Sequence, residues 1–401
     1  MRQNVVQVNE MRSAREKSSF GLLCAVFAIA ALFSIDCADA GPSFQILTNL
    51  DGSNGSIPVG GTPALDNEGN VFLPVRHGGL NNMGTVVRVS PRHPTKVIHT
   101  FDGKDGNSPQ GGLLYDSSTG TFFGTTTAGG LEDCDCGVLY SIDSSGKETV
   151  LHRFDGVQDG SFPVDAPSRD HRGNLYGVAR YGGAGGQDSG TVWKRAFKGG
   201  FKILHAFSGG DGANPAAGLL DGKKGLFYGT TVSGGAHNAG TVFSISTGGT
   251  FTTLHSFDAE SDGASPYATP IQDKLGNLYG TAVAGGPGGG GTIYKLAPDG
   301  TFTVIHAFSN DLNGDFPQTS LVLVKGKLYG TTDYYGDPSC GCGTVFEAGM
   351  DGTLNVLHTF TGKPDGFYPF SGLTRGPNGY LYGDTELGGT GDQGTIYRIK
   401  R

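Results

Sequence analysis

Residues 227–257 decide the fold, and they read FYGTTVSGGAHNAGTVFSISTGGTFTTLHSF. Three runs rich in β-branched and aromatic residues, at 227–231, 241–245 and 251–257, are separated by glycine-containing segments. Such runs are typical of half-buried β-strands, and the segments between them are typical of turns and loops. This stretch therefore predicts three consecutive strands.

The stretch is one copy of a repeat that runs along the chain. A glycine followed by a β-branched and aromatic run recurs at intervals of 50 to 53 residues, at Gly84, Gly137, Gly190, Gly240, Gly291, Gly343 and Gly394. A Leu-Tyr-Gly marker or a degenerate form of it keeps the same register, with its aromatic residue at Phe72, Phe123, Tyr176, Tyr228, Tyr279, Tyr329 and Tyr382. A proline that ends a glycine-containing loop recurs at Pro58, Pro109, Pro163, Pro215, Pro266, Pro317 and Pro369. Chance does not explain three markers in register.

Each copy contains four predicted strands. The first follows the proline, as at 215–220, and the other three correspond to those in the stretch quoted above. A four-stranded unit of about 50 residues that recurs along a chain is typical of a β-propeller. We therefore predict an all-β fold for residues 41–401, a seven-bladed β-propeller with four strands per blade.

The two ends of the repeat region complement each other. The run that begins at Gly394 supplies a third strand, and no fourth strand follows it before Arg401. Residues 44–50 form a fourth strand that has no unit before it. We expect this N-terminal strand to close the last blade, because closure leaves no open sheet edge.

Composition excludes several protein classes. The chain has 71 glycines in 401 residues, and glycine is unfavourable inside helices, so a helix-rich fold is excluded. Its aromatic content of 10% with a net charge of −8 does not fit a disordered chain. With 37 acidic and 29 basic residues, the chain has no positive excess to hold phosphates, and we expect no nucleic-acid partner.

Residues 1–40 have the pattern of a signal peptide. Arg12, Arg15 and Lys17 precede an apolar stretch at 20–33, and Ala38-Asp39-Ala40 offers a cleavage site before Gly41. A retained membrane helix is the weaker alternative, because the apolar stretch is short for a bilayer core of about 30 Å. A lipid anchor at Cys37 is a further alternative. We expect a secreted, periplasmic or extracellular protein with no membrane span in the mature chain.

The repeat resembles a known family. Leu-Tyr-Gly-Thr-Thr, Gly-Gly, Gly-Thr-Val-Phe, Leu-His-x-Phe and Asp-Gly-x-x-Pro recur over nearly the whole mature chain. This pattern is similar to the GloVer (Gloeobacter/Verrucomicrobium-type) tandem repeat of exported bacterial proteins. The resemblance implies a secreted, propeller-like repeat protein whose biochemical role is not established.

One histidine position recurs in six units, at His99, His152, His205, His255, His306 and His358. Catalysis or metal ligation would require particular histidines, whereas this residue is repeated. Strand alternation places His306 on the same face as Val304 and Phe308. We therefore expect these rings to pack between blades and to form one hydrogen bond each. Trp193, the only tryptophan, is expected to fill the core.

Two Cys-x-Cys pairs lie before third-strand glycines, Cys134 with Cys136 and Cys340 with Cys342. They belong to units two and six, which are not neighbours in a seven-membered ring. A disulfide requires its Cα atoms to lie within about 7 Å of each other, so each pair is expected to close locally. Zinc ligation is the weaker alternative, because two separate dithiols lack the remaining ligands.

The Asp-Gly loops gather oxygen atoms, as at 102–107 and 311–315. Calcium takes oxygen ligands, but neither loop has the spacing of a full calcium-binding loop. Aspartate and asparagine before glycine also favour tight turns. We predict turns here, with no metal and no cofactor.

Ligand-binding candidates are the residues that depart from the repeat on the long-loop face or at the mouth of the channel. Two variable positions follow the second strand, Tyr335 replaces a repeated glycine, and Asp165 replaces a small residue on an innermost strand. The candidates are Arg76, His77, Asp165, Arg180, Tyr181, Asp333, Tyr334, Tyr335 and Glu386. Ordinary solvated loops are the alternative interpretation.

These features predict a binding or structural module outside the cytoplasm, a monomer with an extracellular polysaccharide or envelope protein as partner. Charged and tyrosine side chains on a rim suit recognition of such a partner. The alternative is an exported glycan hydrolase or lyase that uses Asp165, Asp333 and Glu386 as acid and base. No nucleophile motif or metal-ligand cluster supports this alternative, and no catalytic residue is assigned.

Overall fold

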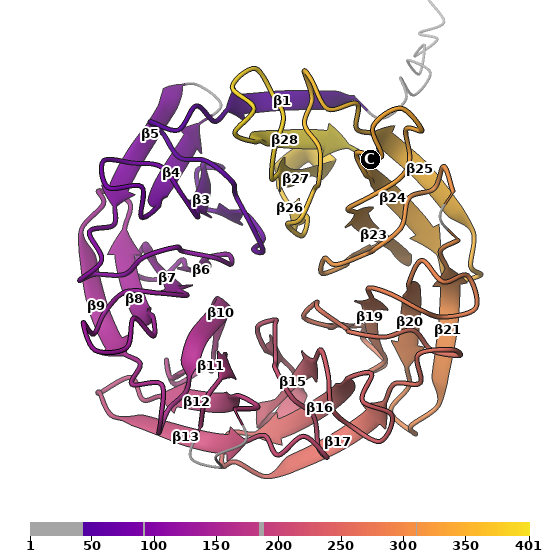
Figure 1. Ribbon diagram of the computed structural model, residues 1–401, viewed down its shortest axis with the longest axis horizontal. Helices are drawn as coiled ribbons and strands as arrows, with labels where there is room; N and C mark the ends of the chain where they lie inside the picture. The colour runs from indigo at the N-terminus through magenta and orange to yellow at the C-terminus, as the bar shows by residue number, and fades with distance from the viewer. Residues whose placement is uncertain (1–42, 91–92, 184–187, 310) are drawn as a thin grey trace, which may run out of the picture. The chain divides into compact units, whose positions relative to one another are not determined.

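The computed structural model describes residues 43–90, 93–183, 188–309 and 311–401. The predicted signal peptide, residues 1–40, lies outside the described residues. The described residues form seven antiparallel sheets of four strands, arranged in a ring in Figure 1. The predicted seven-bladed propeller is confirmed.

The strands of each blade follow one another from the inside of the ring to the outside. Blade 1 contains β2 (Ala64–Leu65), β3 (Val71–Val75), β4 (Thr85–Ser90) and β5 (His93–Thr100). Blade 2 contains β6 (Leu114–Asp116), β7 (Thr121–Thr126), β8 (Val138–Asp143) and β9 (Glu148–Arg153). Blade 3 contains β10 (Ser161–Arg169), β11 (Leu175–Tyr181), β12 (Thr191–Arg195) and β13 (Phe201–Ala206). Blade 4 contains β14 (Leu220–Asp221), β15 (Leu226–Thr231), β16 (Thr241–Ser246) and β17 (Phe251–Ser256), with the 3-10 turn η1 (Lys223–Gly225).

The remaining blades follow the same order. Blade 5 contains β18 (Ile271–Gln272), β19 (Leu278–Ala282), β20 (Thr292–Leu296) and β21 (Phe302–Ala307). Blade 6 contains β22 (Val322–Val324), β23 (Lys327–Thr332), β24 (Thr344–Gly349) and β25 (Leu354–Thr359). Blade 7 contains β26 (Thr374–Arg375), β27 (Tyr380–Thr385), β28 (Thr395–Lys400) and β1 (Phe44–Asn49), with the 3-10 turn η2 (Pro377–Gly379).

Strand β1 closes blade 7, as predicted. It pairs antiparallel with β28, and Phe44 lies opposite Ile399 in this register. The Phe44 ring stacks on His358 of blade 6, with 3.8 Å between the ring centroids. The N-terminal strand therefore completes its own sheet and also contacts the preceding blade.

The innermost strands are shorter than predicted. The segment at 215–220 contributes only the beginning of β14, and β10 alone reaches nine residues. Glycine and other small residues line the centre of the ring and offer few side chains for cross-strand packing. In the six blades other than blade 3, the innermost strand therefore has only two or three residues.

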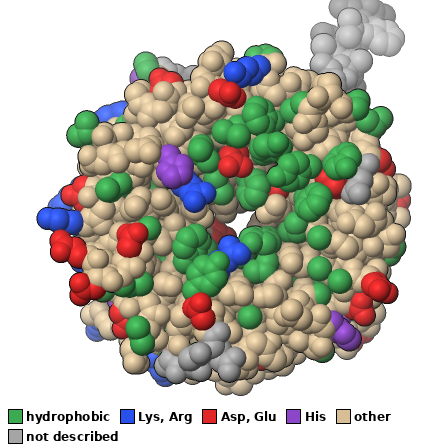
Figure 2. Space-filling model, viewed as in Figure 1, with side chains coloured by type: hydrophobic (Ala, Val, Ile, Leu, Met, Phe, Trp, Pro, Cys, Tyr) green, Lys and Arg blue, Asp and Glu red, His purple; other side chains and the backbone are tan. Residues whose placement is uncertain are grey.

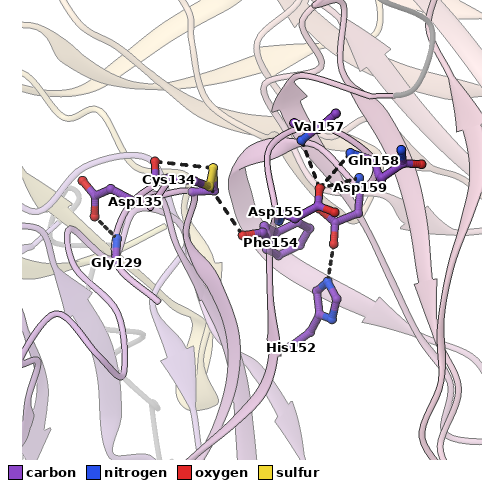
Figure 3. Close-up of a disulfide and its surroundings, with 10 residues drawn as sticks. Gly129, Cys134, Asp135, His152, Phe154, Asp155, Val157, Gln158 and Asp159 are labelled. Atoms are coloured by element: carbon purple, nitrogen blue, oxygen red, sulfur yellow. Dashed lines mark hydrogen bonds and ion pairs between the residues drawn. A yellow bond between two sulfur atoms is a disulfide. The ribbon is translucent and has the colours of Figure 1, made fainter. Parts of the chain in front are cut away.

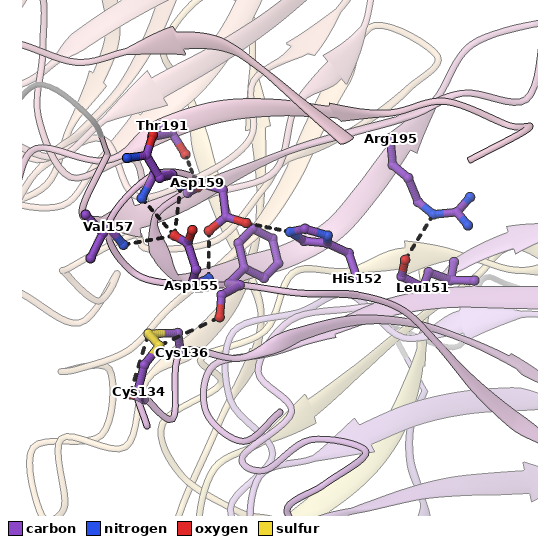
Figure 4. Close-up of polar contacts among 11 residues, drawn as sticks. Cys134, Cys136, Leu151, His152, Asp155, Val157, Asp159, Thr191 and Arg195 are labelled. Atoms are coloured by element: carbon purple, nitrogen blue, oxygen red, sulfur yellow. Dashed lines mark hydrogen bonds and ion pairs between the residues drawn. A yellow bond between two sulfur atoms is a disulfide. The ribbon is translucent and has the colours of Figure 1, made fainter. Parts of the chain in front are cut away.

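The repeated histidine joins neighbouring blades. In four blades its ring stacks on the aromatic ring that begins the next outermost strand, with 3.6 to 3.9 Å between centroids: His152 on Phe201, His205 on Phe251, His255 on Phe302 and His358 on Phe44. In five blades Nε2 lies 2.6 to 2.9 Å from an aspartate of the following loop: His99–Asp105, His152–Asp159, His205–Asp211, His255–Asp262 and His358–Asp365. Figure 4 shows the pair in blade 2. The expected packing between blades is confirmed.

Three junctions depart from this pattern. Between blades 5 and 6, Leu354 occupies the position of the phenylalanine, and Nδ1 of His306 lies 3.0 Å from the carbonyl oxygen of Gly352. Between blades 7 and 1, Thr95 donates a hydrogen bond to Thr48 at 2.9 Å in place of the aromatic stack. Between blades 1 and 2, Glu148 occupies the position of the phenylalanine. Burial, followed by the charge of Asp105, raises the pKa of Glu148 to about 7. The junctions are therefore not equivalent, although the blades share one architecture.

Candidate functional site

The centre of the ring holds a cavity of about 370 Å³ that residues from all seven blades line. Figure 2 shows the opening, with hydrophobic side chains gathered beside it. Asp165, on β10, lines this cavity. Its carboxylate accepts hydrogen bonds from the backbone of Ala166 at 2.7 Å, Gly218 at 3.0 Å and Gly112 at 3.4 Å. This candidate residue therefore connects blade 3 to blades 2 and 4.

Arg180 lines the same cavity, from near the end of β11. Its guanidinium donates to the hydroxyl of Tyr267 at 2.5 Å and lies 5.2 Å from the centroid of that ring. It also lies 5.5 Å from the ring of Tyr181, so both candidates belong to one cation–π cluster. This arrangement holds the Arg180 side chain in place, and a ligand would have to displace it from Tyr267.

Four other candidates form a charged group that spans blades 6, 7 and 1. Asp333 follows β23 and is fully buried, with neither carboxylate oxygen accepting a hydrogen bond from the described residues. Burial and then the charge of Glu386 raise the pKa of Asp333. Burial also raises the pKa of Glu386, which Arg76 opposes. The pKa of His77 is lowered by burial and then by the Arg76 charge.

Tyr334 and Tyr335 line a second cavity, of about 490 Å³, in blade 6. Tyr368, from the loop between β25 and β26, lies 5.0 Å from Tyr334 between ring centroids. Leu312 completes the apolar wall, with 67% of its side chain exposed. We call this cavity, with its three tyrosines and Leu312, the tyrosine pocket. Its volume lies within the range of about 300–1,000 Å³ that is common for ligand pockets.

Tyr335 is held in a left-handed conformation, with φ of 61°. The repeat has glycine at this position in the six other blades, where φ is 69 to 88°. A Cβ atom on those glycines would come within 2.1 to 2.6 Å of loop backbone. The loop of blade 6 differs in sequence and accommodates the tyrosine. Non-glycine residues in this conformation are strained by roughly 1–2 kcal/mol, and such strain clusters at functional sites.

The structure joins Cys134 to Cys136 and Cys340 to Cys342. Figure 3 shows the first pair near the loop that contains Asp155. Cys340 lies in the wall of the tyrosine pocket. Its disulfide with Cys342, two residues away in sequence, constrains the loop that carries Tyr335.

The aspartates of the Asp-Gly loops are used in turns. The carboxylate of Asp102 accepts the backbone N–H of Lys104 at 2.9 Å and of Asp105 at 3.2 Å. The carboxylate of Asp311 accepts the N–H of Asn313 at 2.7 Å. Within the described ranges, no group of three or more histidine, cysteine or acidic side chains is arranged to hold a metal ion.

The structure thus divides the predicted candidates into three groups: the cavity at the centre, the charged group and the tyrosine pocket. Sequence reasoning missed Tyr267, Tyr368 and Leu312, together with two buried aspartates. Burial raises the pKa of Asp315 to about 6 and of Asp384 to about 7. Leu312 and Asp384 both break the repeat, so comparison of the copies could have found them.

Fold and repeat together define the class of protein, a repeat β-propeller. The sequence matches the model of the Gloeobacter/Verrucomicrobia repeat over residues 26–243 and 222–401, and the chain belongs to this family. No match was found among the curated proteins.

Two solved structures share the fold. Oligogalacturonate lyase from Vibrio parahaemolyticus superimposes with a TM-score of 0.56 at 10% identity, over 90% of this chain and 94% of the lyase. PorZ, a surface component of the type-IX secretion system of Porphyromonas gingivalis, superimposes with a TM-score of 0.54 at 15% identity, over 89% of this chain and 48% of PorZ. At these identities the likeness concerns the fold alone. Within the described residues, no helix has the length and apolar character that a membrane crossing requires.

Proposed function

We propose that the protein is an exported carbohydrate-binding module whose ligand occupies the tyrosine pocket. The observation that carries this proposal is Tyr335, a strained and 45% exposed aromatic residue where the repeat has glycine. The six other blades have glycine here, which adopts the conformation without strain, so the fold itself does not require a tyrosine. An exposed aromatic ring that the fold does not require is explained if the ring contacts a ligand.

The pocket suits a sugar in its shape and chemistry. Tyrosine rings offer flat apolar faces together with a hydroxyl, a combination that is common in recognition surfaces. The carboxylates of Asp311 and Asp337 lie in the same wall and can accept hydrogen bonds from sugar hydroxyls. The predicted signal peptide supports a location outside the cytoplasm, where polysaccharides of the cell envelope are accessible.

Catalysis by the charged group has less support. The charge of Glu386 raises the pKa of Asp333, but the Asp333 side chain has no exposed surface and does not reach a substrate. The carboxylate of Asp165 is already occupied by backbone N–H groups. A general acid must touch the bond that is broken, so the tyrosine pocket supports binding better than these residues support hydrolysis.

Tyr335→Gly is expected to separate stability from function. The variant restores the residue of the other blades and relieves the strained backbone, so the free energy of unfolding should rise by up to about 1 kcal/mol. Binding should be lost because the ring is gone. Urea unfolding measures the first effect, and a glycan array measures the second. A variant that is less stable and binds unchanged would contradict the proposal.

Two further variants complete the array experiment. Tyr334→Ala should also lose binding, since Tyr334 lines the same pocket. Arg180→Ala is the control at the centre of the ring, where the side chain is engaged with Tyr267. Binding that depends on Arg180 and not on Tyr334 would place the ligand in the central cavity and reject the tyrosine pocket.

A further inference from the structure

A large groove lies between blades 7 and 1 on the face opposite the tyrosine pocket. Strand direction alternates, so the β2–β3 turn and the start of β5 emerge on the face away from the long β3–β4 and β23–β24 loops. The groove has a volume of about 650 Å³. Its functional side chains are Glu68, Arg88, His93, Tyr380, Tyr382 and Arg398. We call it the arginine groove.

Arg398, on β28, lines the groove, and two contacts hold its guanidinium group in place. Its guanidinium lies 4.4 Å from the centroid of the Tyr380 ring, in cation–π geometry. Its Nε donates to Oε1 of Gln45 at 2.9 Å. Within the described ranges no hydrogen bond or ion pair engages its two terminal nitrogens. The guanidinium group is therefore held in place, and its two terminal nitrogens can still donate hydrogen bonds.

Arg88, on β4 of the neighbouring blade, lines the same groove. No ion pair or hydrogen bond occupies its guanidinium in the described part of the chain. Among the described residues that line the groove, Glu68 is the only acid, and its carboxylate already accepts a hydrogen bond from Asn70 at 3.3 Å. Two arginines thus lack a carboxylate partner on a chain whose net charge is −8.

The repeat does not require these arginines. The equivalent groove between blades 3 and 4 has Lys194 at the same repeat position, 5.2 Å from the Tyr176 ring. Its Nζ donates to the carbonyl of Thr247 at 3.5 Å. Asp170 and Asp221 line that groove beside Arg172, Lys194 and Lys224. The departure in the arginine groove is the pair of arginines at one repeat position on adjacent blades, where blades 3 and 4 have Lys194 and Ser244.

We propose that the arginine groove binds a carboxylated oligosaccharide, a segment of an acidic polysaccharide. A guanidinium fork binds a carboxylate through two parallel hydrogen bonds, and two forks on adjacent blades can engage successive acidic sugars. Tyr380 and Tyr382 supply aromatic rings for the apolar faces of the sugars. A second, acidic-sugar site on this face is independent of the tyrosine pocket.

The test is calorimetric titration of the mature chain, from Gly41, with a galacturonate hexamer and with a neutral galactose hexamer. We expect the acidic hexamer to bind and the neutral one not to bind. Arg88→Gln and Arg398→Gln should each weaken binding about tenfold or more, because each removes one guanidinium–carboxylate pair. Lys194→Gln is the matched control at the equivalent groove and should leave the affinity unchanged.

Each other outcome overturns the proposal. The proposal fails if the acidic hexamer does not bind, if the neutral hexamer binds equally well, or if Arg88→Gln binds with unchanged affinity. Complete displacement of the hexamer by sodium sulfate at the same anion concentration would show a simple anion site instead. Loss of hexamer binding in Tyr335→Gly with full binding in Arg88→Gln would assign the ligand to the tyrosine pocket. Arg88→Gln is the decisive variant, because Arg88 makes no described contact that the fold needs.

Discussion

A chain that lacks residues 43–50 is expected not to fold. This segment supplies β1, whose Phe44 stacks on His358 and whose neighbour Leu50 is fully buried. A fully buried side chain of this size contributes about 1.5–3 kcal/mol; since Leu50 is fully buried and Phe44 and Leu47 are partly buried, their loss should cost roughly 3–6 kcal/mol, and the backbone hydrogen bonds between β1 and β28 are lost in addition. Natural domains have a total stability of about 5–15 kcal/mol, so little or none would remain.

Circular dichroism on heating and size-exclusion chromatography measure this result. The truncated chain should lack a cooperative transition and should self-associate, because β28 would become an open edge strand. The control begins at Pro42, retains β1 and should melt cooperatively. A synthetic peptide of residues 43–50 should restore folding when it is added. A truncated monomer with the melting temperature of the control would show that β1 does not close the ring.

Asp384→Thr is expected to stabilise the protein strongly at alkaline pH. Four blades have threonine at this position, and each hydroxyl donates to a carbonyl of the next innermost segment: Thr125 to Asp165, Thr230 to Ala268, Thr281 to Thr319 and Thr331 to Pro369. Asp384 is fully buried, and its Oδ1 accepts a hydrogen bond from Ser371 at 2.7 Å. Its Oδ2 has no hydrogen-bond partner among the described residues. A carboxyl group can replace the donating hydroxyl only when it is protonated.

The pH dependence follows from this burial. The pKa of Asp384 is raised from 3.8 to about 7. Below pH 3.8 the group is protonated in both the folded and the unfolded chain, so it carries no penalty. As pH rises toward 7, only the unfolded chain releases the proton, and the folded state loses about 1.4 kcal/mol per pH unit, roughly 4 kcal/mol in all. The stabilisation by Asp384→Thr should therefore be small at pH 4 and largest at pH 8.

Urea unfolding at several pH values measures the difference between the two chains. Thr281→Asp is the matched control, because it introduces the acid at the same position of blade 5, where Thr281 is buried. That variant should be destabilised mainly above pH 4 and thus mirror Asp384→Thr. A difference between Asp384→Thr and the unchanged chain that is equal at pH 4 and pH 8 would contradict protonation of Asp384.

The sequence was sufficient to predict the architecture, because each blade repeats the same local signals. Leu-Tyr-Gly and Gly-Thr-Val-Phe mark the middle strands, and the unpaired run at 44–50 predicts the closure of blade 7. Tyr335 was found because it replaces glycine. In each case the information lies within one copy, or in a comparison between copies.

Contacts between blades could not be predicted in the same way. The carboxylate of Asp165 suggests acid–base chemistry when it is considered alone, but it accepts N–H groups that are 53 residues away in sequence, at Gly112 and Gly218. Asp384 occupies a position where four other blades have threonine. The effect of this replacement can be judged only when the carbonyl that accepts the threonine hydroxyl on the next blade is known. Tyr267 reaches Arg180 across an intervening blade, and no spacing in the sequence indicates that approach.

The central claim is that the three tyrosines of blade 6 and its neighbour contact a sugar, and fluorine NMR tests it most directly. A chain that begins at Gly41 is labelled with fluorotyrosine, its signals are assigned with single Tyr→Phe variants, and it is titrated with the glycan that the array identifies. The signals of Tyr334, Tyr335 and Tyr368 should shift on binding, while those of the buried Tyr140 and Tyr294 should not. A ligand that binds and leaves the three pocket signals unchanged would contradict the account.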